Sequence, residues 1–511
     1  MNINEAKDQI KKAVSIYLKK DEYGIYRIPQ ERQRPVFLLG APGIGKTAII
    51  EQIAKELDIA LVSYSMTHHT RQSALGLPII KHKKYGDVEF DVSEYTMSEI
   101  IASIYETMEK TKKTEGILFL DEINCVSETL APSMLLFLQY KMFGKHKVPE
   151  GWIVVTAGNP PQFNRSVREF DIVTMDRLKV LEVDADYETW RAYAVNNSFH
   201  TAVITYLDIK TKDFYSIENT VDGKSYVTAR GWENLSETLF LYEEMLYKVD
   251  ETLVAQYLRN QRIARDFSAY YDLFIKYKQD YKVSAILTGK PEREIIKMAK
   301  EAGFDERLSL MGLLLEAIQN NIHECVAKED ELKLLHKHLK HVKELFSGSL
   351  SMENCVELLE HEAMLLTNEM NEKDIANSLS TADEHSYIAV IRSIRDFANR
   401  IKLQRVVDSN AAFDLIKSIF DADVAKMREN NRQTSLKLSN LFDFVENVFK
   451  EESEMLILVT DLTINKDTAR FISANGCDKY FKYNKKFQLY ERGNKILEDI
   501  KNLEADELTF N

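Results

Sequence analysis

Short apolar runs alternate with helical patterns along the first third of the chain, and this alternation determines the fold we expect. Between the first two runs, Ile49, Ile53 and Leu57 recur at helical spacing, with Ile50 and Ala54 beside them. Short apolar strands separated by helices are typical of a parallel sheet covered on both faces. The sequence therefore predicts an α/β fold with a five-stranded parallel sheet, its strands at residues 36–39, 60–66, 117–120, 153–157 and 179–183.

Beyond Tyr187 the strand pattern nearly vanishes, and helical patterns continue to the C-terminus. Asp186 is placed to cap the first of these helices. A short apolar stripe follows, made of Leu335, Leu339, Val342 and Phe346. Its length favours packing in a helical bundle over a coiled coil. The apolar segment MLILVTDLT at Met455 fits a strand or a helix, and we favour a buried helix because no sheet partner is in view.

Composition agrees with a globular, helix-rich protein. The 511 residues are 45% hydrophobic and 29% charged, and a chain of this length predicts two to four domains. The formal net charge of −13 argues weakly against nucleic acid as a partner. Four cysteines lie far apart without a CxxC pair, which favours reduced, buried thiols over a disulfide framework or a zinc site.

The N-terminal segment predicts an amphipathic helix that packs on its own protein. Lysines interrupt its apolar positions, so it does not fit a signal peptide. No apolar run approaches the ~18–20 residues that a bilayer span needs. We therefore expect a soluble cytoplasmic protein that does not insert into membranes.

A glycine-rich segment follows the first predicted strand and matches GxxxxGK[ST] in full. In such a loop the chain turns from strand to helix so tightly that successive backbone N–H groups point at one phosphate chain. Lys46 would face the β- and γ-phosphates, the Thr47 hydroxyl would ligate magnesium, and the following helix adds its dipole. The sequence thus predicts a site for a nucleoside triphosphate and Mg²⁺, formed by Gly40, Ala41, Pro42, Gly43, Ile44, Gly45, Lys46 and Thr47.

An acidic pair follows the third predicted strand, in the segment GILFLDEIN. Ligands of open α/β sheets bind at the carboxyl ends of the strands, where Asp121 and Glu122 would emerge. Asp121 suits the magnesium shell, and Glu122 suits polarisation of the attacking water. This pair is a common sequence feature on its own, and together with the phosphate loop it predicts hydrolysis of the nucleotide.

Three further residues are candidates whose immediate context is less specific. Asn159 stands just past the fourth strand, where an amide could orient water beside the γ-phosphate or simply form a turn before two prolines. Arg177 and Arg230 could serve phosphates, although an isolated arginine is more often a solvated surface group.

The order of these motifs resembles the AAA+ superfamily and, more closely, its MoxR-type branch. The matching strings are GAPGIGKT, LFLDEIN, VVTAGNP, MDRL and TARGW, and LGLPII…DVEF resembles the insertion that this branch carries in helix 2. The resemblance covers residues 33–240. It implies an AAA+ core at residues 1–184 and an α-helical lid at 185–282. We expect an all-α region at 283–511 that selects the partner.

The resemblance also implies roles for the three candidates. Asn159 corresponds to sensor 1, Arg177 to the arginine finger that reaches a neighbouring subunit, and Arg230 to sensor 2 on the lid. This sequence departs from the family pattern at three positions, Cys125, Leu178 and Ala229. The first puts one intersubunit contact in doubt, while the other two fit tolerated packing changes.

By resemblance, then, we expect an ATP-hydrolysing, chaperone-like motor that forms a homo-oligomeric ring, usually a hexamer in this family. Its expected client is a protein with a von Willebrand A domain. Two alternatives stay open, a DNA-directed motor and a nucleotide-dependent switch with little hydrolysis. The basic clusters at Lys81 and Lys141 are interpreted as exposed loops, and the histidines near the C-terminal stripe as a charged helical face without ligand role, namely His323, His336, His338 and His341.

Overall fold

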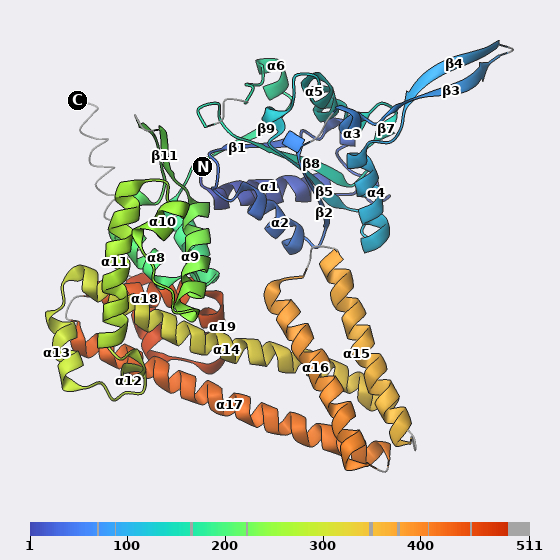
Figure 1. Cartoon of the computed structure of the whole chain (residues 1–511). Coiled ribbons are helices and arrows are strands. Elements are labelled where there is room, and N and C mark those ends of the chain that lie inside the picture. The colour runs from blue at the N-terminus through green and yellow to red at the C-terminus, as the bar shows by residue number, and fades with distance from the viewer. Residues whose placement is uncertain are drawn as a thin grey trace, which may run out of the picture. The chain divides into compact units, whose positions relative to one another are not determined.

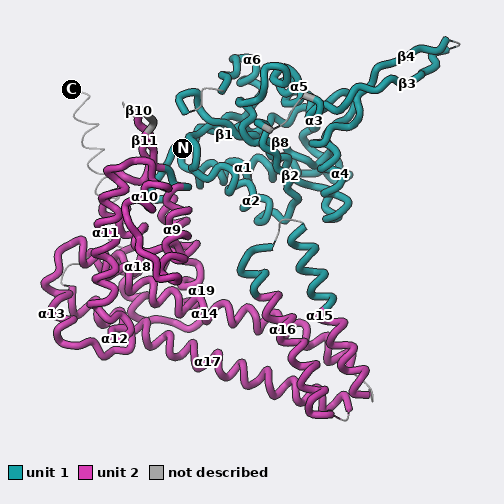
Figure 2. Tube along the Cα trace, in the orientation of Figure 1, with its two compact units in different colours: residues 1–189, 228–230, 364–385 teal, residues 190–227, 231–363, 386–511 magenta. Residues whose placement is uncertain are grey.

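The computed structural model of the chain forms two compact units (Figure 2). Unit 1 comprises residues 1–189, 228–230 and 364–385, and unit 2 comprises residues 190–227, 231–363 and 386–511. The structure describes residues 1–68, 71–86, 88–163, 167–220, 223–346, 351–375, 379–406, 408–449 and 452–488. None of the described helices has the length and apolar content needed to cross a membrane.

A five-stranded sheet forms the centre of unit 1, in the order β2-β5-β8-β1-β9 (Figure 1). All neighbouring strands are parallel, and residues 36–39 of β1 pair with 155–158 of β8 on one side and 179–182 of β9 on the other. The five predicted strands are confirmed, as β1 (Val36–Gly40), β2 (Ala60–Ser65), β5 (Gly116–Asp121), β8 (Trp152–Gly158) and β9 (Lys179–Val183).

Apolar side chains on both faces of the sheet explain its position in the core. Every residue of β8 is buried, and the first five residues of β5 are buried as well. The surrounding helices are α1 (Ile3–Tyr17), α2 (Lys46–Glu56), α3 (Arg71–Leu75), α4 (Glu99–Thr111), α5 (Ala131–Tyr140) and α6 (Ile172–Met175). As predicted, α1 is amphipathic and packs on its own protein, where Lys7 and Lys11 both pair with Glu56 at the end of α2.

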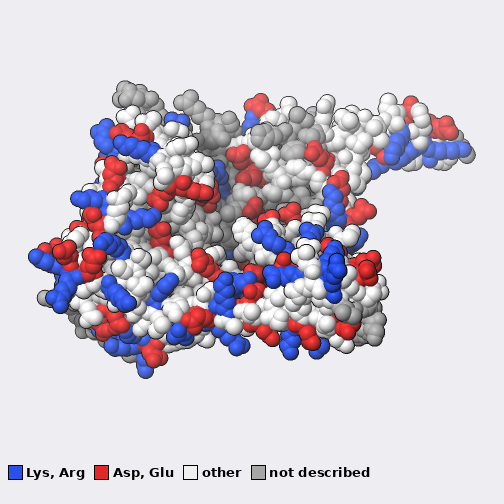
Figure 3. Space-filling model, turned by 60° about the horizontal axis from the view of Figure 1, so that its bottom comes forward, with Lys and Arg blue, Asp and Glu red and all other residues white. Residues whose placement is uncertain are grey.

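Two hairpins replace the exposed loops that the basic clusters had suggested. The first joins β3 (Pro78–Tyr85) to β4 (Val88–Tyr95), and the second joins β6 (Met142–Phe143) to β7 (His146–Lys147). The longer hairpin projects from unit 1, with lysines on one strand and acidic residues on the other (Figures 1 and 3). The expectation for Lys141 was wrong, because this side chain is buried and its Nζ donates to the backbone carbonyls of Gln30 and Gln33.

Helices dominate the rest of the described chain, as predicted. They are α7 (Tyr187–Asn196), α8 (Thr201–Ile209), α9 (Ala229–Glu244), α10 (Glu251–Tyr257), α11 (Gln261–Asp280), α12 (Val283–Leu287), α13 (Arg293–Glu301), α14 (Phe304–Leu345), α15 (Met352–Ile375), α16 (Thr381–Gln404), α17 (Ser409–Val448), α18 (Glu452–Ile464) and α19 (Lys466–Asn475). Asp186 caps α7, since its carboxylate accepts the N–H of Thr189 at 2.9 Å. Within this helical part, the sequence analysis also missed the hairpin of β10 (Ser216–Thr220) with β11 (Gly223–Val227).

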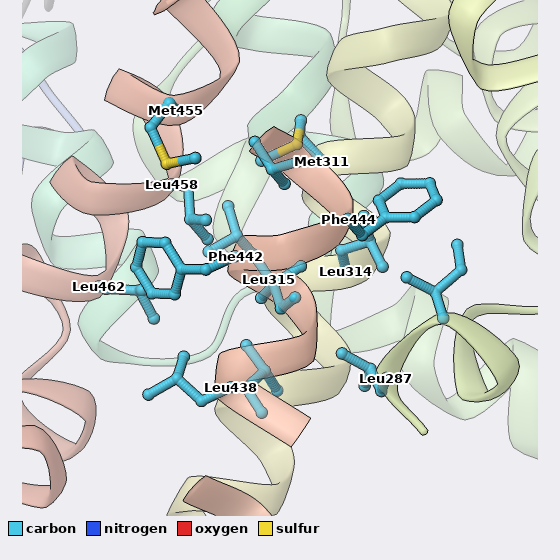
Figure 4. Packing of buried hydrophobic residues seen from close by; sticks show 14 of the residues in the cluster. Leu287, Met311, Leu314, Leu315, Leu438, Phe442, Phe444, Met455, Leu458 and Leu462 are labelled. Carbon is cyan, nitrogen blue, oxygen red and sulfur yellow. The ribbon is translucent and has the colours of Figure 1, made fainter. Parts of the chain in front are cut away.

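An apolar core of unit 2 lies where α12, α14, α17 and α18 meet (Figure 4). Leu314 of α14, Phe442 of α17 and Leu458 of α18 are fully buried there. The segment at Met455 is therefore a buried helix, as predicted, and the stripe from Leu335 is buried on α14.

Two expectations about single residues, in both units, were wrong. The four histidines were expected to lie mostly on a charged helical face, but His338 is buried: its Nδ1 lies 2.7 Å from Oε1 of Glu362, while Nδ1 of His341 lies 2.8 Å from the other oxygen. The cysteines carry free thiols, but only Cys325 and Cys355 are buried, and Cys125 and Cys477 are partly exposed.

Candidate functional site

The predicted phosphate loop connects the end of β1 to the start of α2. Gly45 caps α2 in the left-handed region with φ of 92°, and Gly43 has φ of 75°. Side chains other than glycine rarely adopt these angles, so the two glycines allow the tight turn. The loop therefore has the backbone path that its sequence pattern requires, with Ile44 buried beneath it.

Lys46 begins α2, and its ammonium group lies inside this loop. Its Nζ donates to the carbonyls of Gly40 at 2.7 Å and Ala41 at 2.8 Å, and to Oδ1 of Asn159 at 2.9 Å. Burial lowers the pKa of Lys46 to about 8, against the opposing effect of Asp121. Its three partners among the described residues are neutral oxygens, and a buried ammonium with neutral partners is well suited to an anionic ligand.

Thr47 and the acidic pair lie next to each other at the carboxyl edge of the sheet. The Thr47 hydroxyl donates to Oδ2 of Asp121 at 3.0 Å, and Oδ1 of Asp121 accepts the N–H of Glu122 at 2.8 Å. Glu122 has φ of 54°, an uncommon angle for a residue with a side chain. Such outliers persist where surrounding structure holds them and are frequent at functional sites. The Ser65 hydroxyl, at the end of β2, lies 3.5 Å from Oε2 of Glu122.

Asn159 is brought to the phosphate loop, where it contacts Lys46. It follows β8, and its side-chain oxygen contacts Lys46 while its backbone oxygen accepts from Nδ2 of Asn124 at 2.8 Å. The parallel pairing of β8 with β1 and β5 explains this position, because all three strands end at the same edge.

Arg230 also lies near the phosphate loop. A Cβ atom built on Gly43 would be 3.1 Å from Cβ of Thr228 and 3.5 Å from Cβ of Arg230. The Arg230 charge is close enough to oppose protonation of Lys46 and so lowers the pKa of that lysine further. Two positive side chains thus converge on one loop, which favours a polyanionic ligand.

Arg177 is not held by the phosphate-binding residues of its own chain. It is exposed, and its Nη1 donates to Oε1 of Gln139 on α5 at 2.7 Å. Exposed apolar residues belong to the same two segments: Ile172 (87% exposed) and Val173 on α6, and Leu136 and Tyr140 on α5. On α5, Gln139 shares one helical face with Leu136 and Tyr140. Through Gln139, Arg177 is therefore hydrogen-bonded to a face that also carries exposed apolar side chains.

Three residues that contact candidate site residues escaped the sequence analysis. Ser65 and Gln139 give no local signal, since their partners are distant in sequence. Asn124 belongs to the DEIN string itself, and its position two residues after Glu122 could have pointed to it.

These residues fit a nucleoside triphosphate with magnesium. The buried Lys46 ammonium and the nearby Arg230 suit phosphate oxygens, and the Thr47 hydroxyl with the Asp121 carboxylate offers the oxygen ligands that Mg²⁺ prefers. Glu122 lies beside Asp121, and its N–H donates to Oδ1 of that residue.

Comparison with known proteins agrees with this geometry. The model of the AAA family, ATPases associated with various cellular activities, matches residues 36–174. No curated protein matches the chain. A solved structure described as the structure of C. elegans PCH-2 is similar over 40% of this chain and 48% of that chain, with 14% sequence identity and a TM-score of 0.24. The chain thus spans about half the length of that relative. From the family match and the five-stranded sheet, we conclude that this chain contains an AAA ATPase domain.

Proposed function

We propose that this chain binds ATP with Mg²⁺ and hydrolyses the γ-phosphate bond. The proposal rests on two hydrogen bonds at the phosphate loop. Lys46 donates to Asn159 at 2.9 Å, and Thr47 donates to Asp121 at 3.0 Å. Glu122 would accept a proton from the attacking water, and Lys46 and Arg230 would stabilise the negative charge that develops on the phosphate oxygens. Magnesium, when bound, would offset further phosphate charge.

Replacement of the acid beside the metal ligand tests this proposal. Glu122→Gln should lower the steady-state rate of phosphate release by at least about 100-fold, since a general base contributes about 10²–10⁴-fold. The variant should still bind ATP. Glu109→Gln, an exposed change on α4, is the matched control and should keep the wild-type rate. Normal turnover by Glu122→Gln would refute the catalytic assignment.

We also propose that catalysis requires a second copy of the chain. Arg177 is bonded to Gln139 on a surface with Ile172 and Leu136, and a neighbouring subunit that covered these apolar residues would receive Arg177 at its own nucleotide. An arginine supplied in this way is worth about 10³–10⁵ in rate. The ring is expected to be a hexamer, by resemblance.

Oligomer size and activity should therefore change together. Ile172→Glu should dissociate the assembly and lower the rate of hydrolysis, because a charge would enter an apolar interface. Leu403→Glu, at an equally exposed leucine on α16, is the control. A monomeric wild-type protein with full activity would contradict this proposal.

Resemblance to the MoxR type supports a role as a cytoplasmic, chaperone-like motor that remodels a protein with a von Willebrand A domain. The β3–β4 hairpin supports contact with another macromolecule, since Ile80, Tyr85 and Phe90 are half or more exposed on it. In this proposal residues 1–184 hydrolyse ATP, residues 185–282 form the lid and residues 283–511 select the partner. Co-purification with Glu122→Gln in the presence of ATP, followed by mass spectrometry, would identify that partner. Recovery of DNA in place of protein would favour a DNA-directed motor.

A further inference from the structure

Asn124 is a buried polar residue to which the proposed reaction gives no role. Only 4% of its surface is exposed, and it lies two residues after Glu122 in the short turn that follows β5. Its Nδ2 donates to the backbone oxygen of Asn159 at 2.8 Å. The side chain therefore connects the strand end that carries the acidic pair to the strand end that carries the candidate sensor.

Close packing holds this side chain in one position. A Cβ atom on Gly158 would lie 2.5 Å from Oδ1 and 2.7 Å from Cγ of Asn124, so only glycine leaves room for the amide at that point. Gly158 directly precedes Asn159. The fit of the amide against Gly158 and its bond to the Asn159 carbonyl together fix the backbone at the end of β8.

The main chain of Asn124 makes a third connection. Its carbonyl accepts the N–H of Arg168 at 2.9 Å, in the segment that leads to α6 and Arg177. On the other side, Asn159 contacts Lys46 through Oδ1 at 2.9 Å. Hydrogen bonds thus connect the phosphate loop to Asn159, then to Asn124, and then to the segment before Arg177.

We infer that Asn124 is a positioning residue for nucleotide hydrolysis: it holds the Asn159 amide at a fixed place relative to the Glu122 carboxylate. This inference rests on the proposed function. Asn124 touches neither phosphate nor water in this assignment, and acts through Asn159. Since displacement of about 1 Å at a reacting centre costs up to about 100-fold in rate, loss of this bond should lower kcat.

Asn124→Asp is the decisive variant, because it keeps the shape of the side chain and replaces the donor with a carboxylate oxygen that repels the Asn159 carbonyl. We expect kcat for ATP to fall roughly 10- to 100-fold while KM stays within about threefold, since ground-state binding of phosphates by Lys46 is retained. The matched control is Asn475→Asp, which removes a similar amide–carbonyl bond to Phe471 on α19. It should leave kcat unchanged.

A second variant separates positioning from general damage to the fold. Gly158→Ala should push the Asn124 amide away and lower kcat by a similar factor. If both changes act on one connection, the double variant should lose far less than the product of the two single effects. Both changes should also lower the midpoint of thermal unfolding, because a methyl group or a carboxylate enters a packed site. The loss of kcat should therefore be measured well below each midpoint, where the variant is fully folded.

Three outcomes decide the matter. If Asn124→Asp turns over ATP at the wild-type rate, the inference is wrong, although hydrolysis at this site would stand. Equal losses in kcat, nucleotide affinity and thermal stability would mean a purely structural role and would also overturn it. Absence of hydrolysis by the wild-type chain would instead refute the proposed function.

Discussion

The hydroxyl of Thr47 lies 3.0 Å from Oδ2 of Asp121, although the two residues are 74 positions apart in the sequence. Thr47 is the second residue of α2, the helix after β1, and Asp121 ends β5; β1 and β5 are separated in the sheet by β8. A hydroxyl and a carboxylate at this separation can share one cation, and Mg²⁺ accepts such a pair when phosphates and water complete its octahedron.

Removal of the Thr47 hydroxyl should lower the affinity for ATP only when Mg²⁺ is present. Thr47→Val has nearly the same shape but lacks the ligand, so affinity for ATP with Mg²⁺ should fall at least roughly tenfold. Affinity for ATP measured with a chelator should match wild type. Calorimetric titration in the two conditions provides the measurement, and an equal loss in both would show that Thr47 does not serve the metal.

Nucleotide affinity should depend on alkaline pH through Lys46. Because burial lowers the pKa of this lysine to about 8, its ammonium form dominates in the nucleotide-free site only below that pH. A triphosphate favours the charged form, so binding at higher pH requires proton uptake. Affinity should therefore fall as pH rises above about 8, by up to tenfold for each pH unit.

Fluorescence titration with a nucleotide analogue between about pH 7.5 and about pH 9.5 would measure this effect. Lys46→Arg is the control, because a guanidinium keeps its proton over that range. Its affinity should be lower but independent of pH. Wild-type affinity that stays constant across the range would contradict the assignment of Lys46 to the phosphates.

Much of this site could be predicted from sequence because its residues directly follow apolar runs. Residues 36–38, 117–120 and 153–157 are buried, so their apolar character marks the strands. The glycine-rich loop after the first strand and the polar residues soon after the other two mark the edge of the sheet. Lys46, Asp121 and Asn159 lie close together because the parallel strands that precede them end at the same edge of the sheet. The local spacing of apolar and polar residues is therefore enough to predict that these three side chains are neighbours.

The hairpins and the buried lysine could not be inferred in the same way. Lys81 and its neighbours form a ribbon exposed on most positions, so no alternation of apolar and polar residues marks β3 as a strand. Burial of Lys141 depends on two carbonyls more than 100 positions away, and burial of His338 depends on Glu362 of another helix. Partners far away in the sequence therefore determine whether Lys141 and His338 are buried, and the local spacing of residues gives no information about such partners.

Arg191 of α7 should be essential to unit 2, because it forms ion pairs with Asp208 of α8 at 2.7 Å and Asp461 of α18 at 2.6 Å. Arg191→Met would remove the arginine partner of the buried Asp461 and of the partly buried Asp208, at a cost of about 3–5 kcal/mol. Thermal unfolding should detect this loss, and added Asp208→Asn and Asp461→Asn should restore much of it. Arg432→Met, which breaks an exposed pair with Glu429, is the control and should leave the midpoint unchanged.

Acid should weaken unit 2 through Glu243. Burial alone would raise the pKa of this carboxyl, but hydrogen bonds from His200 and Lys278 outweigh it and bring the pKa to about 2. The pKa of an unfolded glutamate is higher, so the stabilisation is complete above that ordinary value and is lost as pH falls toward about 2.

Glu243→Gln should remove this dependence. At neutral pH it should cost about 1.5–3 kcal/mol, as expected for hydrogen bonds to a charged group, and its denaturation midpoint should then change less with acid than that of wild type. Glu244→Gln, at the exposed neighbouring position, is the control. It should keep the wild-type stability at neutral pH and the wild-type loss of stability in acid. An equal acid response in wild type and Glu243→Gln would disprove it.

The nucleotide-binding unit is assembled from three separate stretches of sequence, residues 1–189, 228–230 and 364–385. A fragment that stops at residue 189 would contain the whole sheet and yet lack Arg230, as well as the stretch whose Leu379 carbonyl accepts from Lys55 of α2 at 3.3 Å. Truncation is therefore a poor way to dissect this protein. Enzymology and crystallisation trials should use the intact polypeptide, and an inactive amino-terminal piece would say nothing against ATP hydrolysis by the whole.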